Sequence, residues 1–151
     1  MINQLAISQI NALVSDNITG TLVCFDKADK RKFHIPYVCE GDYLYSYSEV
    51  SEKIEIMRND PTVLLKVYQK NNETDWSNAK ILGIYEELKG IEAEIARCII
   101  KDKMAAISES KYQPSEKPRE SSTLESKLES SEVIYRIRMV KKSGKTQNLL
   151  Q

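Results

Sequence analysis

The sequence has few of the residues that most metal and nucleotide sites require. It contains one histidine and three cysteines, and Cys24, Cys39 and Cys98 form no CxxC pair. This argues against a zinc site, a histidine-based metal site and a disulfide framework, and it is typical of a reducing compartment such as the cytoplasm. Five glycines form no G-x-G-x-x-G loop for a dinucleotide. The sequence therefore predicts no metal ion.

Charge of one sign and long apolar runs are also missing. Lys+Arg and Asp+Glu both number 22, so the net charge of zero removes the global electrostatic case for nucleic acid. No segment approaches the roughly 18 apolar residues of a membrane span, and the N-terminus lacks the basic and apolar regions of a signal peptide. The length of 151 residues fits one cytoplasmic domain over residues 1–151 that binds neither nucleic acid nor membrane.

What the sequence does contain is a series of short apolar or alternating segments between turn signals. The connections are mostly hairpin-like, which excludes a parallel doubly wound sheet. Gly83 lies inside the longest segment, where glycine often marks a bulge or bend. We therefore expect a mainly β protein with flanking helices, a six-stranded antiparallel barrel with strands at residues 21–25, 33–40, 43–48, 62–69, 76–88 and 133–140.

Three segments with helical spacing accompany these strands. They are residues 4–15, a short helix that begins near Ser48 or Ser51, and a long helix over 91–107. Residues 110–131 contain seven serines and two prolines and predict a mobile loop within the single domain. The long helix places four residues on one side, which are Ile91, Ile95, Cys98 and Ile99.

The segment YSYSEVSEK, residues 45–53, gathers hydroxyl groups and a lysine at the start of the short helix. Hydroxyls, free helix-start amides and a cation together suit an anion such as phosphate. An N-capped helix on a solvated face, with Lys53 paired to Glu49, explains the same residues. The local sequence leaves both interpretations open.

A resemblance to a known family bears on this choice. The run FHIPYVCEGDYLYSYSEVSEKIEIMRNDPTVLLKVYQ, followed by WSNAKILGIYEEL, resembles the FMN-binding split barrel of the pyridoxamine 5′-phosphate oxidase-like superfamily. Within it, the run is most similar to small flavoproteins that include nitroimidazole-resistance reductases. The order of a proline-bearing strand, a hydroxyl-rich strand end, S-x-K, a short helix and N-x-P-x-V carries the resemblance, over residues 5–105 and 133–146. It implies a homodimer that binds FMN at the subunit interface and acts on a small molecule.

The resemblance also implies a role for particular residues. The flavin ring is expected along the proline-bearing strand, at His34, Ile35, Pro36, Tyr37 and Val38. The phosphate is expected near Ser46, Tyr47, Ser48, Ser51 and Lys53, Asn78 would present its amide to the flavin, and Trp76 would approach the ring from the neighbouring subunit. No catalytic residue is assigned.

Plainer explanations exist for several of these residues. Pro36 also suits an ordinary edge strand, Trp76 also suits core or dimer packing, and His34 also suits a packed or exposed position. Glu52 departs from the better-characterised oxidases, which have a second basic residue there. A carboxylate beside a phosphate is unfavourable unless it points away, so pyridoxamine phosphate oxidase activity itself is not expected.

Three functions remain open at this point. The first is an FMN-dependent oxidoreductase, in which the cofactor carries the chemistry. The second is an FMN carrier or sensor without turnover. The third is a haem-binding split barrel, for which His34 is the obvious axial ligand.

Overall fold

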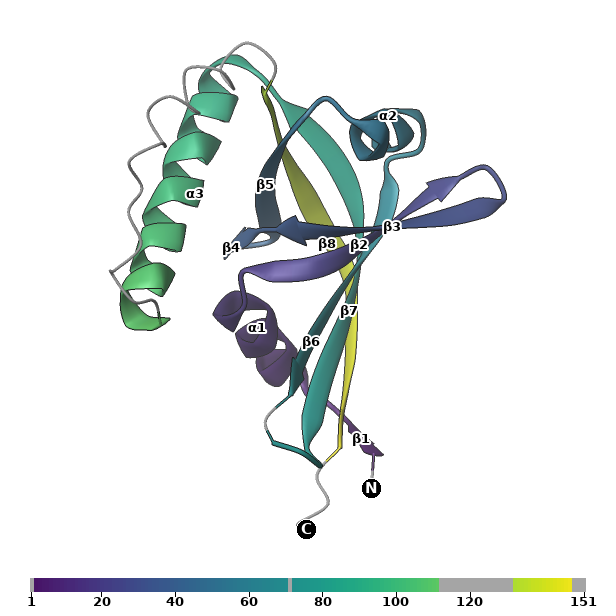
Figure 1. Cartoon of the computed structure of the whole chain (residues 1–151), viewed down its shortest axis with the longest axis vertical. Coiled ribbons are helices and arrows are strands. Elements are labelled where there is room, and N and C mark those ends of the chain that lie inside the picture. The colour runs from purple at the N-terminus through teal and green to yellow at the C-terminus, as the bar shows by residue number, and fades with distance from the viewer. Residues whose placement is uncertain (1, 71, 112–131, 148–151) are drawn as a thin grey trace.

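The structure is a computed structural model that describes residues 2–70, 72–111 and 132–147, with side chains described outside 107–111. These ranges contain eight strands and three helices (Figure 1). The helices are α1 (Ile7–Asp16), α2 (Glu52–Asn59) and α3 (Gly90–Lys111). The strands are β1 (Ile2–Gln4), β2 (Thr19–Asp26), β3 (Asp29–Pro36), β4 (Val38–Glu40), β5 (Tyr43–Glu49), β6 (Thr62–Lys70), β7 (Trp76–Leu88) and β8 (Glu132–Gln147).

The strands form one curled sheet in the order β3-β2-β6-β7-β8-β5-β4, and β1 pairs with β8. Every pairing is antiparallel, so the mainly β fold with flanking helices is confirmed. The predicted count of six strands is wrong. Pro36 has no N–H for a ladder and ends β3, and the Tyr37 N–H donates to the Ile18 carbonyl at 2.8 Å, so β4 is a separate strand. The eighth strand is β1, which lies largely outside the predicted helix.

The last strand continues beyond its predicted end. The sequence predicts this strand over residues 133–140, but β8 runs on through residues 141–147 and pairs with both β7 and β1. The register between β7 and β8 shifts between Leu82 and Gly83, which confirms the irregularity predicted at this glycine.

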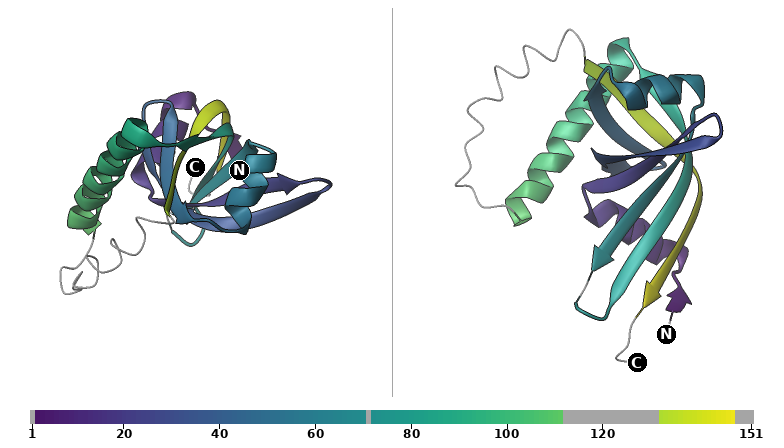
Figure 2. Two further views of the ribbon diagram at one scale, coloured as in Figure 1. Left: turned by 90° about the horizontal axis from the view of Figure 1, so that it is seen from above. Right: turned by 45° about the vertical axis from the view of Figure 1, so that its right-hand side comes forward.

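The interior of the curled sheet holds the main core. Alternate residues of β6 point inward, so Val63, Leu65 and Val67 are buried whereas Lys66 and Tyr68 lie on the outer face. A second apolar cluster fills the space between α3 and the sheet edge formed by β4, β5 and β8. Figure 2 shows α3 on one side of the sheet and the β2–β3 hairpin projecting from the other.

The buried face of α3 is not the side that Ile91, Ile95, Cys98 and Ile99 share. Ala93, Ala96 and Ile100 pack toward the sheet, whereas Ile91 is 78% exposed and Ile95 is 55% exposed. Cys98 is exposed as well, and of the four predicted residues only Ile99 packs against the second cluster. The small alanines let the helix approach the strands.

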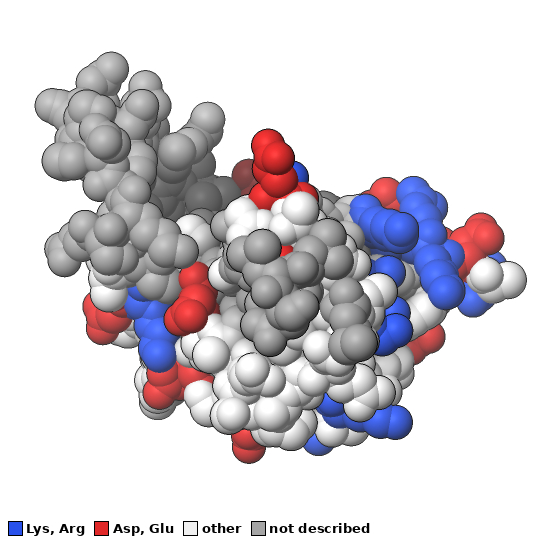
Figure 3. All heavy atoms as spheres, turned by 90° about the horizontal axis from the view of Figure 1, so that it is seen from below, with Lys and Arg blue, Asp and Glu red and all other residues white. Residues whose placement is uncertain are grey.

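Basic side chains gather on the side of the molecule where the β2–β3 hairpin projects (Figure 3), and Lys30, Arg31 and Lys32 of this hairpin are exposed. No helix over the described residues is long and apolar enough to cross a membrane. The predicted mobile loop at 110–131 lies outside the described residues, apart from the last two residues of α3.

Candidate functional site

Ser51 lies directly before α2 in an extended conformation, and its carbonyl accepts the Glu55 N–H at 3.1 Å. Its Oγ atom is buried and has no hydrogen-bond partner among the described residues. Buried hydroxyls in proteins are nearly always paired, so an orphan at a helix start calls for an explanation. The free N–H groups and the dipole of a helix start favour a bound anion. The Ser51 hydroxyl would be a further hydrogen-bond donor to such an anion.

Glu52 and Lys53 lie in the first turn of α2, and both side chains contact β3. Glu52 forms an ion pair with Arg31 of β3, so its carboxylate has a cation of its own. The half-buried Lys53 lies with its Nζ 6.0 Å from the centre of the Phe33 ring. Burial raises the pKa of the Cys24 thiol to about 11, and the charge of nearby Lys53 opposes this rise. Arg31 thus neutralises the Glu52 carboxylate, which the sequence analysis identified as unfavourable beside a phosphate.

The other hydroxyl residues of the segment are not presented together. Ser46 is buried and donates its hydroxyl to the Pro36 carbonyl at 2.6 Å, which ties β5 to the end of β3. Ser48 donates to the Glu49 carbonyl at 2.8 Å. Tyr47 packs against the second apolar cluster. Of this group, Ser51 and Lys53 lie at the start of α2, and over the described residues neither side chain has a hydrogen bond or an ion pair.

The proline-bearing strand contributes mainly to the core. The side chains of Ile35, Tyr37 and Val38 are all buried. The Tyr37 hydroxyl donates to the Val14 carbonyl at 2.7 Å, and burial raises the pKa of this phenol. These three residues can meet a ligand only through main-chain atoms, whereas the His34 side chain is exposed.

His34 and Asn78 come together in a groove on the outer face of the sheet. The groove has a volume of about 560 Å³ and crosses β3, β2, β6 and β7. Trp76 stacks on Tyr68, with ring centres 6.4 Å apart and planes inclined by 27°, and Tyr68 lines the groove. The structure therefore places His34, Asn78 and the Trp76–Tyr68 stack on one face of the sheet.

Three lysines that were not singled out from the sequence also line this groove. They are Lys32, Lys66 and Lys80. The signal for two of them was available, because a lysine between apolar strand residues marks the outer face. That these lysines come together depends on the sheet order, which the sequence alone does not supply.

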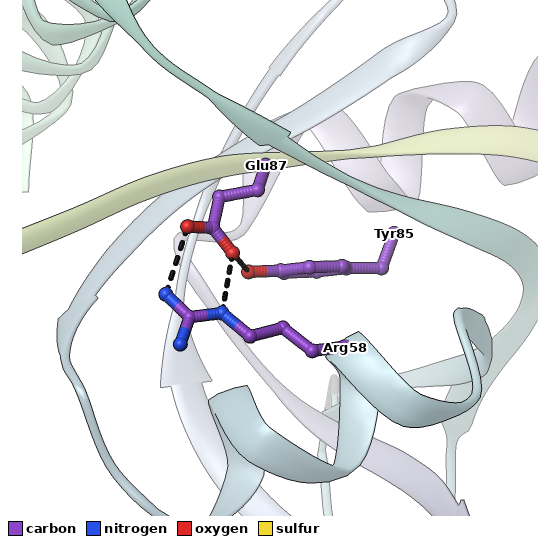
Figure 4. Close-up of polar contacts among 3 residues, drawn as sticks. All are labelled: Arg58, Tyr85 and Glu87. Atoms are coloured by element: carbon purple, nitrogen blue, oxygen red, sulfur yellow. Dashed lines mark hydrogen bonds and ion pairs between the residues drawn. The ribbon is translucent and has the colours of Figure 1, made fainter.

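The opposite end of α2 is fixed by a polar network (Figure 4). Arg58 donates two hydrogen bonds of 2.8 Å to the Glu87 carboxylate, and the Tyr85 hydroxyl donates a third at 2.7 Å. The hydrogen bond and charge of Arg58 lower the pKa of Glu87. This network attaches the helix that begins at Ser51 to β7.

Over the described residues, no group of three His, Cys, Asp or Glu side chains could hold a metal ion.

Several solved structures have the same fold. An FAD-binding protein from Mesorhizobium loti matches with a TM-score of 0.78 and 21% identity, covering 98% of this chain and 99% of that one. A putative 5-nitroimidazole antibiotic resistance protein from Bacteroides thetaiotaomicron has a TM-score of 0.70 and 15% identity over 97% and 89% of the chains. A putative pyridoxamine 5′-phosphate oxidase from Corynebacterium glutamicum has a TM-score of 0.61 and 11% identity, covering 98% of this chain and 94% of that one.

These matches define the class of fold. The chain has the split-barrel fold of pyridoxamine 5′-phosphate oxidase-like proteins, which confirms the fold that the resemblance implies. No protein-family model and no curated protein matches the chain. At these identities the likeness establishes the fold alone.

Proposed function

We propose that this chain is a flavin-binding protein whose cofactor is FMN, with the phosphate held at the start of α2. The observation that carries the proposal is the buried, unpartnered Ser51 hydroxyl, two residues before Lys53. A phosphate there would accept a hydrogen bond from the hydroxyl and from helix-start amides, and Lys53 would supply a point charge. The flavin-binding neighbour of the same fold supports this cofactor class.

The ring would lie along β3, beside the exposed His34 and the groove that Asn78 lines. This groove is open on the outer face of the sheet, and a second copy of the chain would cover the ring there. When bound, the flavin would supply hydride or electron transfer to or from a small molecule. The residues of this chain would hold and orient the cofactor and keep water from its ring.

The cofactor proposal predicts the behaviour of two variants. Lys53→Ala should raise the FMN dissociation constant roughly tenfold to a hundredfold, since one charge-assisted contact contributes about 1.5–3 kcal/mol. Lys101→Ala, an exposed lysine on α3, is the matched control and should leave the affinity unchanged. Flavin fluorescence titration measures both constants. Wild-type affinity in Lys53→Ala would refute the phosphate assignment.

Ser51→Ala separates a ligand role from a structural one. Without ligand, removing a buried unpaired hydroxyl should leave the stability equal or raise it by about 1 kcal/mol, because the unpaired group costs free energy. The same variant should bind FMN more weakly. A loss of apoprotein stability with unchanged FMN affinity would show that the hydroxyl belongs to the fold and not to the site.

Two other functions have their own tests. His34 is exposed at the groove, so haem ligation is a second candidate, and the visible spectrum of purified protein distinguishes haem from flavin. An oxidoreductase differs from a carrier by nicotinamide-dependent turnover with quinones or nitro compounds. We favour the oxidoreductase because the groove leaves room for a small molecule beside His34.

A further inference from the structure

The groove on the outer sheet face has a charged lining of one sign. Lys32, Lys66 and Lys80 line it together with His34, and none of its lining residues is an aspartate or glutamate. The whole chain has 22 basic and 22 acidic residues, so an excess of positive charge in the sequence does not explain this lining. The fold brings basic residues from different strands together on this surface.

The strand register places these side chains in one row. His34 lies opposite Thr21, Thr21 opposite Lys66, and Lys66 opposite Lys80, across β3, β2, β6 and β7. Residues directly opposite in an antiparallel pair share a face and have Cβ atoms about 5 Å apart. The face is the outer one, because the residues that flank the two lysines, Leu65, Val67, Ala79 and Ile81, are buried in the core.

Lys66 and Lys80 thus form a directly opposed pair of like charges. Such a pair destabilises a sheet, and over the described residues neither lysine has an ion pair with a carboxylate. An anion between the two ammonium groups would convert this repulsion into two favourable contacts. The adjacent position across the same strands carries Tyr68 and Asn78, which offer an aromatic ring and an amide.

We propose that this row binds the anionic end, a phosphate or a carboxylate, of the small molecule that reacts at the flavin. The inference rests on the proposed function, because the ring along β3 would place the reacting molecule beside His34. Lys66 and Lys80 bind the anion, and Asn78 and Tyr68 contact the part of the molecule nearer the ring. The substrate class is therefore a small organic anion.

The anion site can be tested without any flavin. Thermal unfolding of the apoprotein, and of each groove variant, is followed in a Lys53→Ala background, so that the probe does not occupy the proposed FMN phosphate site. The probes are pyrophosphate, inorganic phosphate and citrate, each compared with sodium chloride of equal ionic strength. A shift of the unfolding midpoint with pyrophosphate and phosphate but not with citrate would identify a phosphate site. A shift with citrate alone would identify a carboxylate site. The effective probe should raise the midpoint by roughly 3 °C beyond the chloride control at concentrations well above its dissociation constant. Equal shifts with chloride would mean screening only and would overturn the inference.

A charge-matched pair of variants locates the effect. The double variant Lys66→Gln/Lys80→Gln should lose the probe-specific shift and, at low salt, should melt at a higher temperature than the wild type because the repulsion is gone. Lys89→Gln/Lys101→Gln also removes two exposed lysines and should keep the wild-type shift. Loss of the shift in both double variants would show a general charge effect and refute the site.

Binding of FMN separates this inference from the cofactor proposal. Lys66→Gln/Lys80→Gln should retain FMN with an affinity within about twofold of the wild type, while Lys53→Ala loses it. If the lysine double variant loses FMN instead, the groove holds the cofactor phosphate and the substrate inference is wrong. If the wild type binds no flavin but shows the probe-specific shift, the proposed function fails and the anion site remains.

Discussion

Strands β7 and β8 approach each other closely at Gly83. A Cβ atom added there would lie 2.8 Å from the Arg138 carbonyl oxygen and would also meet the Ile137 side chain. The carbonyl belongs to the paired backbone, so it cannot move without disturbing the register shift at this position. We expect Gly83→Ala to lower the free energy of unfolding by about 1–3 kcal/mol, measured by denaturant unfolding. An unchanged unfolding midpoint would contradict this account of the bulge.

The hydroxyl-rich segment shows what can be predicted for single residues. Residue type and spacing were sufficient to place Ser51 and Lys53 at a helix start, where the structure has them. They were not sufficient for Ser46, because alternation along a strand does not say which face is buried or what lies opposite. The Pro36 carbonyl that accepts its hydrogen bond comes from a strand end ten residues earlier in the chain.

The attachment of α2 to β7 gives a prediction at the scale of elements. The hydrogen bond from Arg58 is the largest cause that lowers the pKa of Glu87 in the folded protein. The stabilisation that the ionised Glu87 carboxylate provides is therefore present above the unfolded-state pKa of about 4.3, and it is lost as the pH falls through the folded-state pKa. Stability should therefore decline on acidification below about pH 4.3, and Glu87→Gln should weaken this decline. Denaturant unfolding at neutral and acidic pH measures both.

The control for this element is Glu94→Gln, which changes an exposed carboxylate of α3. It should keep the acid dependence of the wild type. If both glutamine variants respond to acid as the wild type does, Glu87 does not couple the attachment of α2 to pH.

Elements with strong alternation were predictable, whereas the packing of α3 was not. Val63, Leu65 and Val67 follow the two-residue period of a strand with one buried face, and that face is the core. α3 has isoleucines on one side and alanines on another, so hydrophobicity alone favoured the wrong side. The close approach that Ala93 and Ala96 allow depends on β4, β5 and β8, which are distant in sequence.

At the scale of the whole molecule, the basic groove could not be predicted from the sequence because it depends on the order of the strands in the sheet. Lys32, Lys66 and Lys80 come from three strands, and the hairpin β2–β3 brings the first toward the other two through the pairing of β2 with β6. A resemblance that names the fold supplies this order only in general terms. The charge of the groove becomes visible once the register is known.

The last prediction concerns the assembly that the proposed site needs. The groove is open, and Tyr68 at its border is 59% exposed, so one chain alone would leave a flavin ring in water. We expect the FMN-bound protein to sediment as a dimer of the 17.3 kDa chain at micromolar concentration. Tyr68→Arg should shift the mass toward the monomer and weaken FMN binding, because a fourth cation beside Lys32, Lys66 and Lys80 would be buried unpaired against the partner. Ile95→Arg, on the outward side of α3, should leave both the mass and the affinity unchanged. A monomer that keeps FMN at wild-type affinity would contradict the shared site.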